Sequence, residues 1–174
     1  MANQQHLAKL LAGVEDWNEW RQLHHEVQPD LSGANLKEAN LPRVNLSRAL
    51  LNDADLSRAN LAESLLSDAN FTGAILDRAS LSNTDLKGAT LRAAMLSNVD
   101  LRSALLTNAD LTDADLHGAV LTGADISGAT LHGANFGDAD LTDVDLSRAN
   151  TQGARLIDAY FFRRPGELKG NAGE

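Results

Sequence analysis

The sequence contains no cysteine among its 174 residues. This absence excludes a disulfide framework, a thiol nucleophile and a zinc site built on cysteine. Long apolar runs are also absent, since no stretch approaches the roughly 18 residues that mark a membrane-spanning helix. The N-terminal residues lack the apolar core of a cleavable signal peptide. We therefore expect a cytoplasmic protein that does not enter a membrane.

Basic residues are scarce relative to acidic ones, with 15 Lys and Arg against 24 Asp and Glu and a formal net charge of −9. A negative protein repels the phosphates of nucleic acids and the head groups of anionic membranes. We therefore expect no direct binding of nucleic acid and no membrane association. The same charge either favours a basic protein partner or keeps the protein soluble.

Catalytic and metal-binding constellations are missing as well. The five histidines show no metal-ligand spacing: His6, His24, His25, His117 and His132. Serine and threonine are frequent, but none is paired with a base that would activate a nucleophile. The glycines from Gly118 to Gly133 recur every five positions without the strand-to-helix loop that cradles phosphate. The sequence therefore predicts a protein that is not an enzyme and that needs no metal or cofactor.

What the sequence does contain is a large apolar residue at every fifth position from Leu31 to Phe161, a series that we call the comb. Only Thr151 interrupts it. A period of five fits neither a helix, with its period of about 3.6, nor a flat strand, with its period of about 2. Such a regular period is typical of a repeat architecture.

From Leu36 onward a small residue, usually alanine, stands two positions before each member of the comb, and between them stands at most repeats a polar residue, often Asn or Asp. In extended backbone the small and the large residue point to the same side, and the residue between them points the other way. Turn-forming residue types follow at most repeats. Chained units of this kind must coil around an axis, with the comb inside and the polar residues outside.

Units such as Ala34-Asn35-Leu36 and Ala54-Asp55-Leu56 resemble the A(D/N)LXX repeats of the pentapeptide-repeat family, over 27 consecutive units. The resemblance implies an all-β solenoid, a right-handed quadrilateral β-helix in which four pentapeptides form one coil and residues twenty apart stack. We expect this β-helix over residues 30–162. An N-terminal segment of residues 1–29 precedes it and a C-terminal tail of residues 163–174 follows it.

The N-terminal segment predicts one α-helix over residues 4–27, ended by Pro29. Its apolar residues fall at helical spacing on one face: Leu7, Leu10, Leu11, Val14 and Trp17. An open end of a β-helix exposes strand edges and the apolar axis, so we expect this helix to cap the first coil. The alternative is that Trp17 or Trp20 anchors a partner. The segment GVEDWNEWR also resembles the leader of family members from photosynthetic bacteria.

Charge is unevenly distributed along the repeats. Residues 103–146, which we call the acidic stretch, contain eight aspartates and no Lys or Arg: Asp110, Asp113, Asp115, Asp125, Asp138, Asp140, Asp143 and Asp145. Because residues twenty positions apart stack on the same face, these aspartates are distributed over all four faces of the coil. They either are ordinary residues of the repeat that keep the rod soluble or form an acidic surface that attracts a basic partner.

Two apolar features stand at outward positions. Ile75 and Met95 are twenty residues apart, so they stack on one face and form either a small contact patch or ordinary surface residues. Tyr160 and Phe162 flank the inward Phe161 at the C-terminal end. These aromatic residues belong either to a C-terminal cap or to the contact of an end-to-end homodimer, a mode that the family resemblance implies.

Two functions follow from these observations. The first is a rigid, non-catalytic module that binds a protein partner through one of its faces. The second follows from a resemblance to the quinolone-resistance branch of the family, which implies a DNA-mimicking regulator of DNA gyrase and related type II topoisomerases. In that function the acidic stretch would occupy a basic groove.

Overall fold

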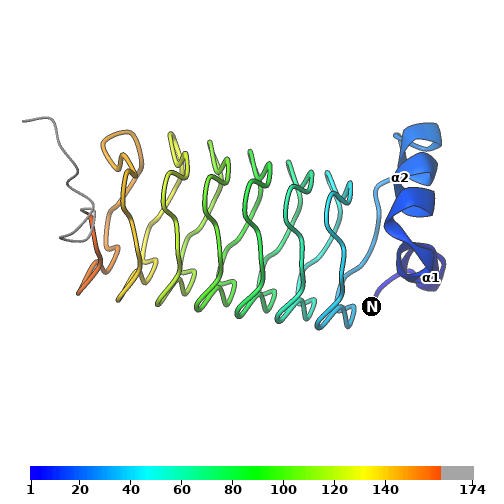
Figure 1. The fold of residues 1–174 in the computed structure, drawn as a ribbon, viewed down its shortest axis with the longest axis horizontal. Helices are drawn as coiled ribbons and strands as arrows, with labels where there is room; N and C mark the ends of the chain where they lie inside the picture. The colour runs from blue at the N-terminus through cyan, green and yellow to red at the C-terminus, as the bar shows by residue number, and fades with distance from the viewer. Residues whose placement is uncertain (162–174) are drawn as a thin grey trace, which may run out of the picture.

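The computed structural model describes residues 1–161, which form a rod with two helices at one end (Figure 1). Helix α1 spans Gln4–Ala12 and helix α2 spans Val14–Leu23. The prediction of one helix over residues 4–27 is therefore wrong. Gly13 separates the helices because its φ of 154° is a conformation open mainly to glycine. Helix α2 also ends well before Pro29, at a cap formed by His24.

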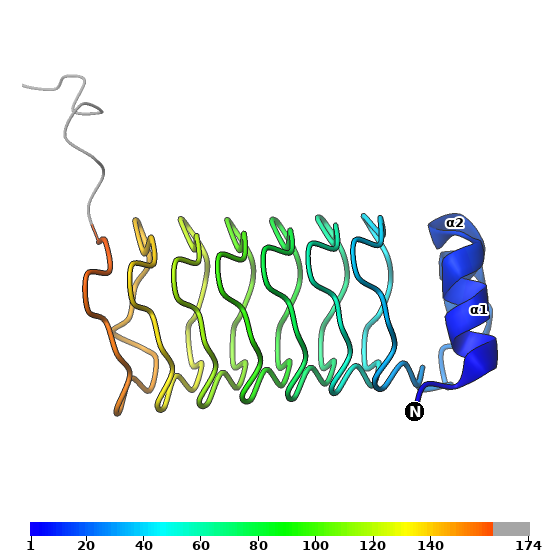
Figure 2. The same ribbon diagram turned by 90° about the horizontal axis from the view of Figure 1, so that it is seen from below.

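Helix α2 lies across the first coil of the rod, formed by residues 30–49 (Figure 2). The indole Nε1 of the fully buried Trp17 donates to the carbonyl oxygen of Asn45 at 2.8 Å. Asn18 accepts from the backbone N–H of Asn45 at 2.8 Å, and Arg21 donates to the carbonyl oxygen of Ser47 at 3.1 Å. The side chains of α2 thus pair with backbone groups at this edge of the first coil.

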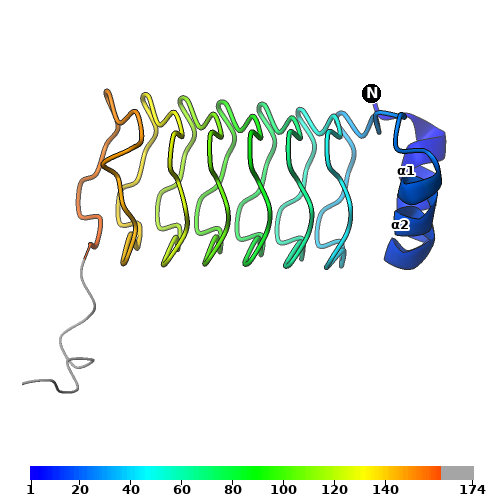
Figure 3. The ribbon, with the colours of Figure 1, turned by 90° about the horizontal axis from the view of Figure 1, so that it is seen from above.

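From Asp30 to Tyr160 the chain makes parallel bridges one residue wide, each joining residues twenty positions apart, as in Ile75 with Met95. Each coil therefore contains four pentapeptides, and the coils stack along one axis (Figure 3). The backbone N–H of one member of the comb donates to the next coil, for example from Leu56 to Ile75 at 2.7 Å. This pairing satisfies the backbone polar groups without long strands.

Each regular corner of the coil is a tight turn. The N–H of the small residue donates back to the carbonyl of the preceding comb residue, as from Ala54 to Leu51 at 3.1 Å. The third residue of the turn has a positive φ, for example 58° at Asp53 and 67° at Gly73. A positive φ at this position is the signature of a type II turn, which Gly, Asn and Asp tolerate best.

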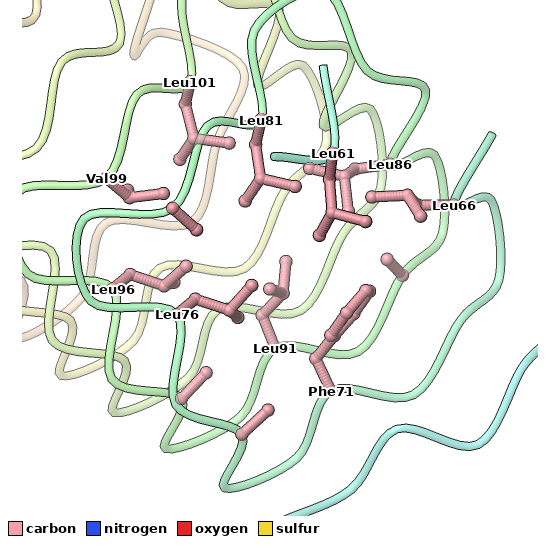
Figure 4. Packing of buried hydrophobic residues seen from close by; sticks show 14 of the residues in the cluster. Leu61, Leu66, Phe71, Leu76, Leu81, Leu86, Leu91, Leu96, Val99 and Leu101 are labelled. Atoms are coloured by element: carbon pink, nitrogen blue, oxygen red, sulfur yellow. The ribbon is translucent and has the colours of Figure 1, made fainter. Parts of the chain in front are cut away.

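The comb points inward, as predicted, from Leu31 to Leu141, where none of its side chains is more than 4% exposed. Side chains from successive coils meet along the axis (Figure 4). Two polar residues replace alanine in the interior, and both are hydrogen bonded. The Oγ of Ser64 donates to the Leu41 carbonyl at 3.2 Å, and the Oγ1 of Thr84 donates to the Leu81 carbonyl at 2.6 Å.

The coil departs from its regular form at one corner, between Asp145 and Ala149, where Figure 1 shows a wider loop. Within residues 1–161, no bridge joins Asp125 to Asp145, although these residues are twenty apart. The N–H of Gly128 donates to the Arg148 carbonyl, one residue later in the register than elsewhere. The β-helix expected over residues 30–162 is therefore irregular at this corner. Thr151 follows this corner and replaces the large apolar residue of the comb. Less apolar surface is therefore buried beside this corner to stabilise it.

Candidate interaction surface

Five aspartates of the acidic stretch occupy the outward position between the small residue and the comb. In each of them Oδ1 accepts a hydrogen bond from the backbone N–H two residues later, at 2.8 to 3.2 Å: Asp110, Asp115, Asp125, Asp140 and Asp145. Asparagines at the same position of other repeats make the same bond, as Asn45 does with the N–H of Ser47 at 3.1 Å. One oxygen of each carboxylate therefore serves the fold.

Hydrogen bonds lower the pKa of several of these carboxylates. The pKa of Asp125 lies below its usual value because the hydroxyl and the backbone N–H of Ser127 donate to it, against a smaller opposing effect of desolvation. Ser147 lowers the pKa of Asp145 in the same way. For Asp110 desolvation is the largest effect and opposes the shift, but bonds from Thr112 and Arg92 lower its pKa overall.

Neighbouring coils supply further partners to the acidic stretch. Arg92 pairs with Asp110 at 3.1 Å, although Arg92 lies before the stretch in sequence. Asp115 accepts from Ser97 at 3.0 Å and from Asn135 at 2.8 Å. These contacts link residues 18 to 20 positions apart. The stretch is therefore less uniformly negative than its composition indicates.

The other three aspartates of the stretch, Asp113, Asp138 and Asp143, lie at corners, with φ of 58°, 56° and 61°. Asp138 faces the half-exposed His117, with 3.7 Å between its carboxylate and Nδ1. These positions suit aspartate because its short polar side chain tolerates the left-handed region. Their presence is thus explained first by the turn.

The eight aspartates do not gather on one face. Bridged residues share a face, and Asp110, Asp115, Asp125 and Asp140 belong to four different columns of bridges. The prediction that they lie on all four faces agrees with this register. A partner that follows one side of the rod therefore meets only part of the acidic set.

The structure brings Ile75 and Met95 side by side through a parallel bridge. Met95 is 45% exposed, and Ile75 is partly buried. Asp55 and Asp115 continue the same column on either side. The contact patch at these residues therefore has a defined geometry, and its use by a partner stays a prediction.

The C-terminal end of the described rod is rich in exposed apolar side chains. Tyr160 is 57% exposed, Ile157 is 72% exposed and Phe161 is 38% exposed. Phe161 therefore does not reach the full burial expected for the comb. Phe162 lies outside the described residues, and the end-to-end contact through Tyr160 and Phe162 stays a prediction.

A pocket with a volume of about 200 Å³ lies within the acidic stretch and extends to Tyr160. Val120, Asp140 and Tyr160 form one wall, since successive bridges stack them in a single column. Asp138, Thr142 and Gly118 complete the lining, together with Ala119. We did not predict this site from the sequence, although the twenty-residue spacing that pairs Ile75 with Met95 also aligns this column.

Residues 1–161 contain no group of three or more metal-ligating side chains placed to hold an ion. Over the same residues, no helix has the length and apolar character needed to cross a bilayer. The geometry as a whole defines a four-sided β-solenoid with a filled interior and outward polar columns.

Comparison with known families identifies this class further. The sequence model described as "Pentapeptide repeats (8 copies)" matches residues 30–68, 64–102, 100–138 and 139–163. The chain therefore belongs to the pentapeptide-repeat family. Members of this family form right-handed quadrilateral β-helices and generally serve as non-catalytic structural or interaction modules. No curated protein gives a significant sequence match.

Solved structures give the same fold. A trypsin-treated variant of QnrB1, a plasmid-mediated fluoroquinolone resistance protein, has a TM-score of 0.66 and 23% identity, covering 77% of this chain and 70% of that chain. Full-length QnrB1 has a TM-score of 0.58 and 19% identity, covering 76% and 72%. HetL, involved in heterocyst differentiation regulation in the cyanobacterium Nostoc, is 28% identical with a TM-score of 0.31, covering 76% and 85%. The two QnrB1 structures support the shared fold alone.

Proposed function

We propose that the protein is a non-catalytic, rigid module that binds a protein partner through the outward side chains of its coils. One observation carries this proposal. Parallel bridges hold outward residues in columns from Asp30 to Tyr160, with a break only between Asp125 and Asp145. Because the backbone fixes these side chains in advance, a partner that binds them loses little conformational entropy in the module.

The proposed partner is basic. Residues 103–146 contribute eight aspartates without Lys or Arg. The carboxylates at the outward position between the small residue and the comb are oriented by backbone N–H groups. Fixed negative charges attract a positive surface and raise its association rate. The pairing of Asp110 with Arg92 lowers the contribution of Asp110 to this attraction.

A variant with five substitutions tests this proposal: Asp110→Asn, Asp115→Asn, Asp125→Asn, Asp140→Asn and Asp145→Asn. Asparagine keeps the Oδ1 acceptor that Asn45 uses at this position, so the fold should persist while five charges are lost. The native protein and the variant would be used as baits in the lysate of the source organism, with partners identified by mass spectrometry. A partner held by the native protein and released by moderate salt supports the proposal. Equal recovery on both baits argues against acidic recognition.

A second candidate is a regulator of type II topoisomerase that imitates DNA with the same carboxylates. Outward carboxylates distributed along a rod favour it, as does the fold shared with QnrB1. The repeats here contain no inserted loop, whereas members of the quinolone-resistance branch often carry such loops. A supercoiling assay with purified gyrase tests whether the protein acts as a DNA mimic. Inhibition by the native protein but not by the asparagine variant supports mimicry, and no effect at micromolar concentration rejects it.

We further propose that residues 1–29 act as a cap. The contacts of Trp17, Asn18 and Arg21 with the first coil support this role, because they occupy backbone groups that a neighbouring coil would otherwise pair. Deleting residues 1–28 should cause aggregation through the exposed edge. A truncated protein that stays soluble and equally stable would show that the helices do not cap the rod. Light scattering and thermal unfolding measure the two properties.

The proposed homodimer uses the C-terminal end, where Tyr160 and Ile157 are exposed. Analytical ultracentrifugation of the full chain tests it. A Tyr160→Glu substitution should shift a dimer to monomer, because it places a charge in an apolar contact. A native protein that sediments as a monomer at all accessible concentrations excludes this contact.

A further inference from the structure

The last coil that the structure describes, residues 145–161, is joined to the rod by fewer bonds than the coils before it, and we call it the end coil (Figure 1). Within residues 1–161 its bridges to the preceding coil lie on three faces and are made by Asn150, Arg155 and Tyr160. On the fourth face the N–H of Leu106 donates to the Asp125 carbonyl at 2.7 Å, but the described residues show no equivalent bond from Ile126 to Asp145. One face of the end coil therefore lacks the pairing that joins all the earlier coils.

The corner that follows this face is also different. Arg148 stands at the corner position where the regular repeats have a positive φ, for example 60° at Asn108, yet Arg148 is not among the described residues with a positive φ. Its carbonyl accepts the N–H of Gly128 at 2.9 Å. In the described part of the chain this is the one backbone hydrogen bond between residues 145–149 and the preceding coil. The segment of residues 145–149 is therefore held more weakly than any regular corner.

The interior of the end coil buries less apolar surface than that of the preceding coil. Thr151 replaces the large residue of the comb. Leu146 and Leu156 are only partly buried, whereas Ile126 and Phe136, twenty positions earlier, are 2% and 1% exposed. Since burial of apolar surface holds the coils together, the end coil is bound to the rod less firmly than the other coils are bound to one another.

We infer that the end coil opens as one unit, on a hinge at residues 145–149, while the rod before it stays folded. Segments with few buried contacts and few backbone bonds open at a lower free energy than the whole protein unfolds. In a solenoid each repeat contacts only its neighbours, so a coil that leaves its single neighbour loses all three paired faces together. Opening uncovers the edge of the preceding coil at Leu131, Phe136 and Leu141.

This opening goes beyond the proposed function, and it also bears on the proposed homodimer. Tyr160 and Ile157 belong to the end coil, so the contact through them exists only when the end coil is closed. A dimer that forms from the closed form alone shifts the equilibrium toward closure. The end coil would thus couple the pairing of two copies to the folding of seventeen residues in each.

Hydrogen exchange of the full chain, followed by NMR, tests the opening at a concentration where the protein is a monomer. Three amides donate to the end coil at 2.7 to 2.8 Å: Leu131, Phe136 and Leu141. Three amides make the equivalent bonds one coil earlier: Leu111, Leu116 and Leu121. The first set should exchange at least about 100-fold faster than the second, with one common opening equilibrium.

Two results of this measurement would overturn the inference. Equal protection of the two sets would mean that the end coil is held as firmly as the coil before it. A gradient of protection that rises steadily from Leu141 to Leu131 would mean that the chain frays residue by residue from its end, without a hinge at residues 145–149.

A substitution that restores the comb gives a second measurement. Thr151→Leu should slow exchange of the first set by about tenfold, because closure then buries more apolar surface, and it should leave the second set unchanged. The matched control is Thr90→Leu, which adds the same side chain at an outward position of a column that already contains Leu50. This control should change neither set. Exchange of the first set that is as fast in Thr151→Leu as in the native protein would count against the inference.

A series of protein concentrations separates the opening from the homodimer. Slower exchange of the first set at concentrations where ultracentrifugation detects a dimer supports the coupling. If the first set exchanges about 100-fold faster at every concentration and no dimer forms, the homodimer contact is rejected and the hinged end coil is retained. If a dimer forms but the first set is as protected as the second even in the monomer, the end coil does not open and only the dimer contact is retained.

Discussion

At each regular corner of the coil, one residue carries the backbone into the left-handed region. Glycine occupies some of these positions, such as Gly73 and Gly133, where φ is 67° and 69°. Ala93 occupies another, where φ is 52°. An L-residue with a Cβ pays a steric cost there that glycine avoids, and alanine has no polar side chain to compensate. The corners therefore contain local strain at identifiable residues.

Ala93→Gly should stabilise the protein by about 0.5 to 1 kcal/mol, since relief of the left-handed conformation exceeds the extra chain entropy of glycine. Urea unfolding measures the change. Ala94→Gly is the matched control, because Ala94 is buried and is not at a positive φ, so this substitution should lower the stability. A destabilised Ala93→Gly protein would contradict the account of the corners.

Asp55 should link stability to acid pH. The hydroxyl and the backbone N–H of Ser57 hold its pKa below the usual value, against a smaller effect of desolvation. The pKa of Asp55 is thus lower in the folded state than the roughly 3.9 of an unfolded chain. The contribution of Asp55 to the free energy of unfolding is therefore complete at pH values above the unfolded-state pKa and is lost as the pH falls through the folded-state pKa. In Asp55→Asn the acid-induced loss of unfolding free energy, measured with urea from about pH 5 to pH 2, should be smaller. Identical pH curves for the two proteins would refute this linkage.

At the scale of elements, the contact between α2 and the first coil depends on a few side chains. Trp17 is fully buried and donates to Asn45, while Trp20 is only partly buried and stacks on His24 with 5.4 Å between ring centroids. Arg21 is 5% exposed and donates to the Val27 carbonyl at 2.6 Å and to the Ser47 carbonyl. These bonds connect the helix to both the loop after it and the rod.

Trp17→Phe should destabilise the protein by about 1 to 3 kcal/mol, because it leaves the Asn45 carbonyl without its donor and removes buried ring atoms. Trp20→Phe is the control and should cost less, since Trp20 is partly exposed. Thermal unfolding of both variants measures the difference. If Trp20→Phe proves the more damaging substitution, Trp17 is not the main link between helix and coil.

At the scale of the whole molecule, stability comes from a continuous interior filled by the comb and its small partners. Ala89 is fully buried beside Leu86 and Leu91, and its carbonyl accepts from the N–H of Asp110 in the next coil. A larger side chain at this position has no room without displacing one coil from the next. The interior therefore restricts the small positions as strictly as the large ones.

Ala89→Phe should destabilise the rod by about 1 to 3 kcal/mol or more and lower its melting temperature, because overpacking forces the stack apart. Met95→Phe introduces the same ring at an outward position that is 45% exposed, and it should change the stability by less than about 0.5 kcal/mol. Calorimetry of the two variants gives the comparison. An unchanged melting temperature for Ala89→Phe would mean that the interior has space that the burial of Ala89 does not indicate.

The repeat by itself determined the coil. Alternation of small, polar and large residues places Leu86 inside and Asp85 outside, since the opposite orientation would bury carboxylates without partners. The period of five, with the family resemblance, also gave the stacking at twenty residues that joins Ile75 to Met95. These features are local and repeated many times, so a single irregular residue does not change them.

Tertiary structure decided what depends on contacts between coils or between the helices and the rod. The break at Gly13 allows Trp17 to reach Asn45, 28 positions away, and no periodicity in residues 4–27 encodes that distance. The pairing of Arg92 with Asp110 and the wide corner at Arg148 likewise arise between adjacent coils. The pocket at Tyr160 required both the column register and the volumes of the side chains around it. The physical reason is that stacking gives each residue neighbours about twenty positions away, and their sizes and charges set the surface once the repeat has set the backbone.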